Sequence, residues 1–281
     1  QYFGYDEFRQ GQEQLIEAAL NGQDVLGIMP TGAGKSLCFQ IPALMMDGIT
    51  LVISPLISLM TDQVGTLNQA GIHAAFLNSS LTQGQYHTAL KYAMQGRYKI
   101  IYVAPERLET EGFINFALNS GVKISMLAVD EAHCVSQWGQ DFRPSYLKIL
   151  EFLKKLPYRP VLTAYTATAT AEVRDDIMDI LNLRDPFVLT TGFDRENLYY
   201  AVKRPRDKYR ELLSYLKEKE EKMPGSSGII YCLSRKNVEE VCYQLREDGF
   251  SVTRYHAGLS DEERKENQED FIYDRKQVMV A

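Results

Sequence analysis

The residues with the clearest chemical potential form a glycine-rich loop at positions 29–36, MPTGAGKS, which directly follows the apolar run 25–28. This order predicts a strand that leads into a loop and then a helix. Gly32 and Gly34 would let successive backbone N–H groups turn inward around phosphate oxygens, and the helix would present the positive end of its dipole to the same anion. Although Met29 stands where the strict pattern has glycine, the loop is predicted to bind the phosphates of a nucleotide.

Lys35 and Ser36 end this loop with two side chains that suit phosphoryl transfer. Lys35 could reach the terminal phosphates of ATP, and the Ser36 hydroxyl could bind Mg²⁺. An acidic pair follows the apolar run 126–129 and should therefore lie at the carboxyl end of a buried strand, where parallel sheets bind ligands. In this pair, Asp130 would hold the metal and Glu131 would orient and deprotonate the attacking water. The predicted ATP-binding residues of the loop are Thr31, Gly32, Ala33, Gly34, Lys35 and Ser36.

The composition restricts the class of protein. The 281 residues are enough for two domains, and 45% apolar with 24% charged residues is typical of a soluble globular protein. The apolar runs are too short to span a membrane, and the N-terminus shows no export leader. The four cysteines lie too far apart for a zinc or redox motif, so we expect reduced thiols in a cytoplasmic protein, in the bacterial cytosol or associated with the nucleoid. A net charge of −6 argues mildly against nucleic-acid binding by bulk electrostatics, but it leaves room for a local basic groove.

Apolar runs and helical periodicity alternate along the chain, which predicts an α/β fold. In the first part the expected strands are 25–29, 51–54, 100–103, 126–129 and 161–165, and the expected helices include 8–21, 35–46 and 58–70. A second, weaker set has strands at 228–232, 252–255 and 278–281 and helices at 236–248 and 261–273. We therefore predict a domain over 1–190, a polar connection over 191–206 and a second domain over 207–281.

Taken together, the motifs resemble the helicase core of the RecQ family of superfamily 2 DNA helicases, and the resemblance covers the whole chain. Generic helicases share the phosphate loop and the acidic pair, whereas the segment 138–144, WGQDFRP, points to RecQ. The other matching runs are FGYDEFRQGQ at 3–12, SPLISLMTDQ at 54–63, APERL at 104–108, DEAH at 130–133, TATA at 166–169, IYCLSR at 230–235 and YHAGL at 255–259.

The resemblance implies two RecA-like parallel-sheet P-loop NTPase domains in tandem, the second of them incomplete. It implies ATP and Mg²⁺ as cofactors and an ATP-dependent 3′–5′ DNA helicase core, which couples ATP hydrolysis to single-strand translocation and duplex unwinding in DNA repair and recombination. Single-stranded and partly duplex DNA would be the partners of a monomer that has no membrane association. Because the chain stops where the family's next motif begins and the arginine finger would lie beyond it, we expect a fragment that binds nucleotide but hydrolyses it poorly.

The resemblance also assigns the N-terminal segment to nucleotide recognition. Tyr5 would stack on adenine, while Arg9 and Gln12 would contact the edge of the base and the phosphates, since adenine recognition requires an aromatic face and an amide that can donate and accept. An alternative is that this segment caps the core, with Phe3, Phe8 and even Tyr5 packed inward.

DNA contacts are implied at two places. The aromatic-rich segment beyond the acidic pair would hold splayed bases through Trp138, Phe142 and Arg143 and couple this contact to hydrolysis, although a lone tryptophan is more often a core residue. Within it, Gln140 stands where the family has histidine. The other implied strand contacts are Pro55, Ser58, Arg107, the run 166–168 and, in the second domain, Arg235. The threonines of 166–168 could equally cap the helix that follows them.

Two other functions remain open from the sequence. A superfamily 2 RNA helicase or remodeller would share the chemistry of Lys35 and Glu131 but would not need the segment 138–143. A non-motor ATP switch would share the nucleotide site, and strand binding would then be incidental.

Overall fold

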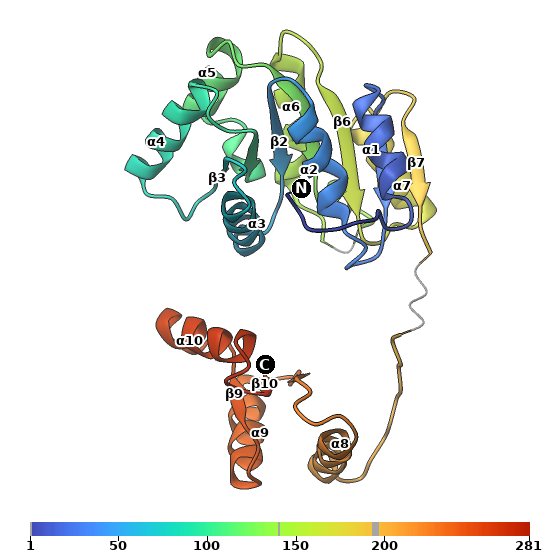
Figure 1. Cartoon of the computed structure of the whole chain (residues 1–281), viewed down its shortest axis with the longest axis vertical. Coiled ribbons are helices and arrows are strands. Elements are labelled where there is room, and N and C mark those ends of the chain that lie inside the picture. Colours follow the sequence, from blue (N-terminus) through green and yellow to red (C-terminus); the bar gives the residue numbers. More distant parts are fainter. Residues whose placement is uncertain (1, 140, 193–196) are drawn as a thin grey trace. The chain divides into compact units, whose positions relative to one another are not determined.

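The computed structural model describes residues 2–139, 141–192 and 197–281. The chain divides into two compact units, unit 1 over 1–195 and unit 2 over 196–281 (Figure 1). Each unit combines a parallel sheet with helices, so the α/β prediction is confirmed. None of the helices in the described part of the chain combines the length and the apolar character that crossing a bilayer would need.

Unit 1 is built on a seven-stranded parallel sheet with the order β3-β4-β2-β5-β6-β1-β7. Its inner strands are short runs rich in Val, Ile and Leu and are buried on both faces, as parallel strands between two helical layers must be. The strands are β1 (Val25–Ile28), β2 (Ile49–Ile53), β3 (Ala74–Leu77), β4 (Ile100–Val103), β5 (Ile124–Val129), β6 (Val161–Thr166) and β7 (Phe187–Thr190).

Helices cover both faces of this sheet, and alternate strand residues point to each layer. Val52 and Met126 face one layer, whereas Leu51 and Leu127 face the other. The first layer contains α1 (Gln12–Leu20), α2 (Lys35–Met45) and α3 (Ile57–Gln69). The second contains α4 (Gln83–Met94), α5 (Glu111–Asn119), α6 (Lys148–Lys155) and α7 (Ala171–Ile180).

The five strands expected in the first part of the chain are present, and their ends differ from the prediction by no more than two residues. The sequence analysis does not predict β3 or β7, the two edge strands. β3 has the sequence AAFL, with only two large apolar residues, and β7 shows alternately half-buried and exposed side chains, so neither has the continuous run of large, buried apolar residues that marks the inner strands.

The strand order brings the predicted chemical segments to one edge of the sheet. β2, β5, β6 and β1 are neighbours, and they are followed by Pro55, Asp130, Thr166 and the phosphate loop. Backbone hydrogen bonds continue past the strand ends. Met29 N donates to Thr166 O (3.0 Å), and Asp130 N donates to Ile53 O (2.8 Å). The strand order and the backbone hydrogen bonds therefore position these loops without any contribution from side chains.

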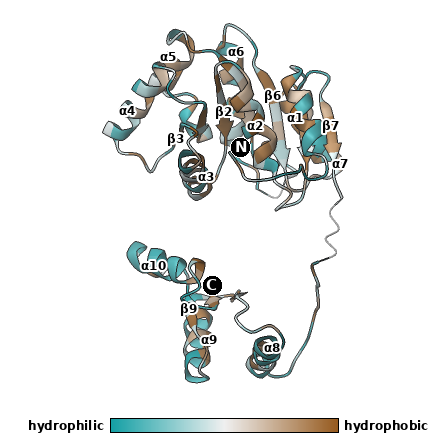
Figure 2. Cartoon of the chain, in the orientation of Figure 1, coloured by the Kyte–Doolittle hydropathy of each residue, from teal (hydrophilic) through white to brown (hydrophobic). Residues whose placement is uncertain are grey.

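Unit 2 has a three-stranded parallel sheet with the order β8-β10-β9 and a small core around Val238, Leu245 and Val280. Its strands are β8 (Gly228–Ile230), β9 (Val252–Arg254) and β10 (Val278–Val280), and its helices are α8 (Lys208–Lys222), α9 (Arg235–Glu247) and α10 (Asp261–Ile272). α8 and α10 contain no buried residue, and α10 is largely hydrophilic (Figure 2). The expected strands of this part are present and end one or two residues earlier than predicted. α10 ends one residue earlier, α9 is shifted by one residue toward the N-terminus, and α8 is not among the helices predicted above.

Asp24 fastens the opposite edge of the unit 1 sheet. Its carboxylate, which is 2% exposed, accepts from both terminal nitrogens of Arg159 and from the backbone N–H groups of Leu162 (3.0 Å) and Arg184 (2.8 Å). These donors precede or begin β6 and β7, and Asp24 itself precedes β1. One buried carboxylate thus holds the starts of three neighbouring strands.

Asp24→Ala should lower the free energy of unfolding of unit 1 by about 2–4 kcal/mol, because it removes the buried carboxylate that accepts from the half-buried guanidinium of Arg159 and from the backbone N–H groups of Leu162 and Arg184. Urea unfolding followed by far-UV circular dichroism would measure the loss. The matched control is Asp47→Ala, which removes an exposed carboxylate and should change the stability by less than about 0.5 kcal/mol. Equal effects of the two substitutions would contradict the role given to Asp24.

Candidate functional site

The phosphate loop leaves β1 and turns in the left-handed region at two glycines. Gly32 has φ 84° and Gly34 has φ 83°, conformations that residues with a Cβ rarely adopt. Gly34 is also the N-cap of α2 and supplies no side chain there, so the first-turn N–H groups of the helix lie open toward the loop. The backbone of 31–36 therefore has the shape and the donors of an anion-binding loop.

Gln12, the first residue of α1, holds this loop through side-chain hydrogen bonds. Its side-chain amide donates to the carbonyl oxygens of Ala33 (3.2 Å) and Gly34 (3.1 Å), and its oxygen accepts from the backbone N–H of Arg9 (2.8 Å). A Cβ on Gly34 would collide with this amide, which is a second reason for glycine at that position. The amide predicted to contact adenine is thus occupied in holding the loop.

The other predicted base-binding residues lie next to Gln12. Tyr5, Arg9, Gln12 and Ser36 line one pocket of about 320 Å³. The Tyr5 side chain is 66% exposed, so it lies at the pocket and not in the core, and the Arg9 guanidinium donates to Gly32 O. The structure therefore brings the N-terminal segment and the phosphate loop together around one cavity.

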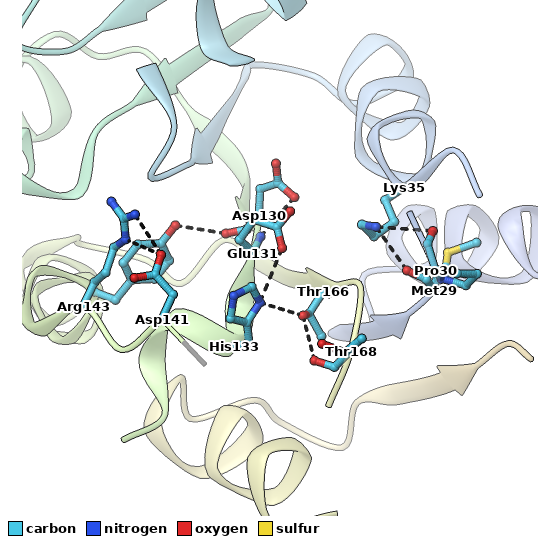
Figure 3. Close-up of polar contacts among 11 residues, drawn as sticks. Met29, Pro30, Lys35, Asp130, Glu131, His133, Asp141, Arg143, Thr166 and Thr168 are labelled. Carbon is cyan, nitrogen blue, oxygen red and sulfur yellow. Dashed lines mark hydrogen bonds and ion pairs between the residues drawn. The ribbon is translucent and has the colours of Figure 1, made fainter. Parts of the chain in front are cut away.

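Lys35, the first residue of α2, bends back over its own loop. Its ammonium donates to Met29 O (3.1 Å) and Pro30 O (3.4 Å), as Figure 3 shows. These carbonyls hold the positive charge at the mouth of the loop, and the side chain would exchange them for the stronger acceptor that a phosphate oxygen offers. Ser36 follows at the same turn and is half-buried.

Asp130 is 7% exposed at the end of β5. Burial raises its pKa to about 6, and the neighbouring charge of Glu131 adds to this shift. The backbone around it is tightly held, because Tyr146 donates to Asp130 O (3.0 Å). Glu131 itself has φ 48°, a left-handed conformation that is uncommon for a residue other than glycine, and its side chain is 25% exposed.

His133 connects the acidic pair to β6. Its Nδ1 lies 2.9 Å from Oγ1 of Thr166 and 3.4 Å from a carboxylate oxygen of Glu131 (Figure 3). Since the single hydroxyl proton of Thr166 is donated to Thr168 O (3.1 Å), Nδ1 of His133 must carry the proton in the first contact. The sequence analysis does not assign this role to His133, because only the fold brings residue 166 next to residue 133.

The aromatic segment lies directly beyond this network. Trp138 is 76% exposed, Phe142 is partly buried, and the Arg143 guanidinium donates to Asp141 (2.8 and 3.0 Å) and to Pro55 O (3.3 Å). The predicted strand contacts Pro55 and Arg143 are thus joined to each other. Trp138 and His133 also line a second hollow of about 260 Å³ with residues 168–170.

The remaining predicted DNA contacts lie farther along the edge or in unit 2. Ser58 is exposed in the first turn of α3. Arg107, in the short 3₁₀ helix Pro105–Arg107, donates to Asn78 O (3.0 Å) and lies over the Tyr86 ring (5.0 Å). Arg235 is the exposed first residue of α9 in unit 2. Gln140 lies outside the described residues.

Mg²⁺ fits the donors at this edge only together with a phosphate and water. Among the residues that the structure describes, no group of three His, Cys, Asp or Glu side chains could hold a metal. A buried carboxylate whose charge is disfavoured by desolvation, at the same sheet edge as a serine hydroxyl of the phosphate loop, is the kind of partial site that Mg²⁺ completes with substrate oxygens and water. Asp130 and Ser36 would hold it.

Comparisons with known proteins identify both parts of the chain. Residues 9–177 match the DEAD/DEAH box helicase family, and residues 207–281 match the helicase conserved C-terminal domain. The chain is similar to the ATP-dependent DNA helicase RecQ of Bacillus subtilis, with 45% identity over 100% of this chain and 46% of that protein. For the ATP-dependent DNA helicase RecQ of Haemophilus influenzae the identity is 47%, over 99% of this chain and 44% of that protein. The chain thus spans less than half the length of these relatives.

A solved structure supports the fold. The DUF1998 helicase MrfA, in a crystal structure bound to DNA, matches 99% of this chain with a TM-score of 0.74 at 17% identity, and the match covers 42% of that protein. At this identity the likeness concerns the fold alone.

Asp130→Asn should stabilise unit 1 near pH 8 and change little near pH 4. Because the pKa of Asp130 is raised from its ordinary 3.8 to about 6 in the folded chain, the stability that the neutral carboxyl contributes is lost as the pH rises through this range. A neutral amide avoids that loss, which is worth about 1–3 kcal/mol. Urea unfolding by circular dichroism at both pH values would measure it. A benefit of Asp130→Asn that is equal at both pH values, or shared by the exposed Asp62→Asn, would contradict this explanation.

Proposed function

The chain belongs to the RecQ family of DEAD/DEAH box helicases, and from this membership we propose that it is the ATP-hydrolysing, strand-binding core of a DNA-unwinding motor. One observation carries the proposal. The phosphate loop, the acidic pair and the exposed aromatic segment meet at one edge of a single parallel sheet, and hydrogen bonds through Thr166 and His133 join them.

The roles of the site residues follow from their chemistry. Bound ATP with Mg²⁺ would supply the phosphoanhydride bond whose hydrolysis drives the motor. Lys35 would bind the terminal phosphates through the ammonium that now contacts Met29 O and Pro30 O. Ser36 and Asp130 would hold the metal, and Glu131 would orient a water and accept its proton. The His133 N–H, shared between Glu131 and Thr166, would keep the carboxylate of Glu131 oriented.

Strand binding is proposed for the surface next to this site. The Trp138 indole is 76% exposed, so most of its apolar surface faces water. A base that stacks on the indole would bury this surface. Arg143, five residues farther along the chain, stays cationic, since its hydrogen bonds with Asp141 raise the pKa of the guanidinium. Pro55, Ser58 in the first turn of α3 and Arg107 in the 3₁₀ helix would contact the phosphate backbone without reading sequence. Phe142, which precedes Arg143 in the sequence, would contact a base, and for unit 2 we propose a strand contact of its own at Arg235.

Finer properties rest on the family resemblance alone. We propose 3′–5′ movement, a role in DNA repair and recombination, action as a monomer and a cytoplasmic location. Slow hydrolysis by residues 1–281 stays a prediction, which a comparison of this chain with a longer protein that contains it would test. The relatives named above are DNA helicases, which favours DNA over RNA as the strand, and an ATP switch without movement would have no use for the exposed segment.

Glu131→Gln should lower the rate of ATP hydrolysis by about 100-fold or more, because the amide cannot accept the proton of the attacking water. Nucleotide binding should persist in this variant and be weakened in Lys35→Ala, which removes the charge that contacts the phosphates. Phosphate release and binding of a fluorescent ATP analogue would separate the two effects. Glu109→Gln, an exposed glutamate paired with Lys148, is the matched control. Hydrolysis that survives Glu131→Gln would mean that another group is the base.

Single-stranded DNA should increase the hydrolysis rate more than RNA of the same sequence and length. Phosphate release measured over a range of concentrations of each strand, in a longer protein that contains this chain, would compare them. Equal stimulation by RNA would favour the RNA helicase or remodeller, and no stimulation by either strand would favour the non-motor switch.

A further inference from the structure

Ser136 forms a link between the aromatic segment and a distant helix. Its hydroxyl donates to Oδ2 of Asp176 (2.6 Å) and accepts from the backbone N–H of Trp138 (3.1 Å). Ser136 is completely buried, whereas Trp138, two residues later, is 76% exposed. A single buried hydroxyl therefore stands between a carboxylate of α7 and the backbone of the exposed tryptophan.

The segment around this hydroxyl folds back on itself. Gly139 N donates to Ser136 O (3.0 Å), and Arg143 N donates to Cys134 O (2.9 Å). A Cβ on Gly139 would collide with the carbonyl oxygen of His133, so the turn brings the two backbones into direct contact. The position of Trp138 thus depends on the short stretch 133–139, and the side chain that ties this stretch to the rest of unit 1 at residue 136 is Asp176.

α7 and the segment that precedes it connect the aromatic segment to the nucleotide site. The helix begins after Thr170, whose hydroxyl accepts from Val173 N (3.3 Å), and Thr170 directly follows the segment 166–169. Thr166 contacts His133 at one end of the stretch, and Asp176 contacts Ser136 at the other. The stretch 133–139, which carries Trp138, is therefore held at His133 and Ser136 by a single continuous piece of chain, residues 166–176.

We propose that Asp176 is a positioning residue, which holds the Trp138 segment through Ser136 in the conformation that receives a DNA strand. This inference rests on the proposed strand-binding role of Trp138. A carboxylate suits the task, because a hydrogen bond to a charged acceptor is stronger than one between neutral groups and fixes the direction of the Ser136 hydroxyl. With the hydroxyl proton directed at Asp176, the oxygen lone pairs are left to accept from Trp138 N. Ordering the segment in advance lowers the entropy lost when a strand binds.

The position of Trp138 can be followed directly, since it is the only tryptophan of the chain. Asp176→Ala should increase the amplitude of the fast local motion of the indole, which is measured as the fast component of the Trp138 fluorescence anisotropy decay. It should also weaken the quenching of Trp138 fluorescence by a 20-nucleotide oligothymidylate, with a midpoint that rises by about tenfold. ATP hydrolysis without DNA should stay within about twofold of the unmodified chain, because Asp176 contacts none of the residues proposed to act on the nucleotide.

Four further variants make this test specific. Asp176→Asn keeps an acceptor oxygen and should retain most of the DNA affinity and of the indole order. Ser136→Ala should reproduce the losses of Asp176→Ala, and the double variant Ser136→Ala/Asp176→Ala should lose no more than either single variant. Asp175→Ala is the matched control, because it removes an exposed carboxylate from the same turn of α7.

The outcomes separate the two proposals. An unchanged anisotropy decay in Asp176→Ala, or an equal change in Asp175→Ala, would overturn the positioning role. Absence of quenching by the oligothymidylate in the unmodified chain would instead contradict the proposed strand-binding role of Trp138, while the anisotropy decay would still test whether Asp176 holds the segment.

Discussion

The hydroxyl and the backbone of one residue, Thr166, hold the site together. It ends β6, which lies between β5 and β1, and is therefore flanked by the acidic pair on one side and the phosphate loop on the other. Its carbonyl accepts from Met29 N, and its hydroxyl accepts from His133 and donates to Thr168 O. All three contacts are buried or partly buried, where a lost partner is costly. A small displacement of β6 would therefore be felt by the nucleotide loop and by the acidic pair at the same time.

The electrostatics of this edge are unbalanced in a way that suits its proposed chemistry. Asp130 is removed from water beside a second carboxylate, and the pKa of Asp130 rises because neither solvent nor a direct cationic partner compensates its charge. Lys35 lowers that pKa but directs its hydrogen bonds to the loop carbonyls. The raised pKa of Asp130 marks a local loss of stability at the acidic pair, whereas the contacts of Asp24 contribute stability at the opposite edge of the sheet.

The sequence predicts what is encoded locally. The glycine loop, the acidic pair and the inner strands follow from runs of a few residues, and each is found where it is expected. β3 and β7 are missed because edge strands carry little apolar signal. The support of the phosphate loop by Gln12 across 22 residues, and the contact of Ser136 with Asp176 across 40, depend on how the helices pack, which no local pattern reveals. For Trp138 the resemblance suggests exposure where composition suggests burial, and the indole is exposed.

The left-handed backbone of Glu131 has a consequence for how this sequence can change over generations. A side chain at φ 48° costs about 1 kcal/mol that glycine would not incur. Replacing Glu131 by glycine would therefore relax the chain while deleting the carboxylate. On the proposed role of Glu131 as the base, lineages that no longer hydrolyse ATP should drift toward glycine at this position, whereas lineages under selection for hydrolysis should retain the glutamate. The residue at position 131 would then record whether a descendant of this protein still needs that base.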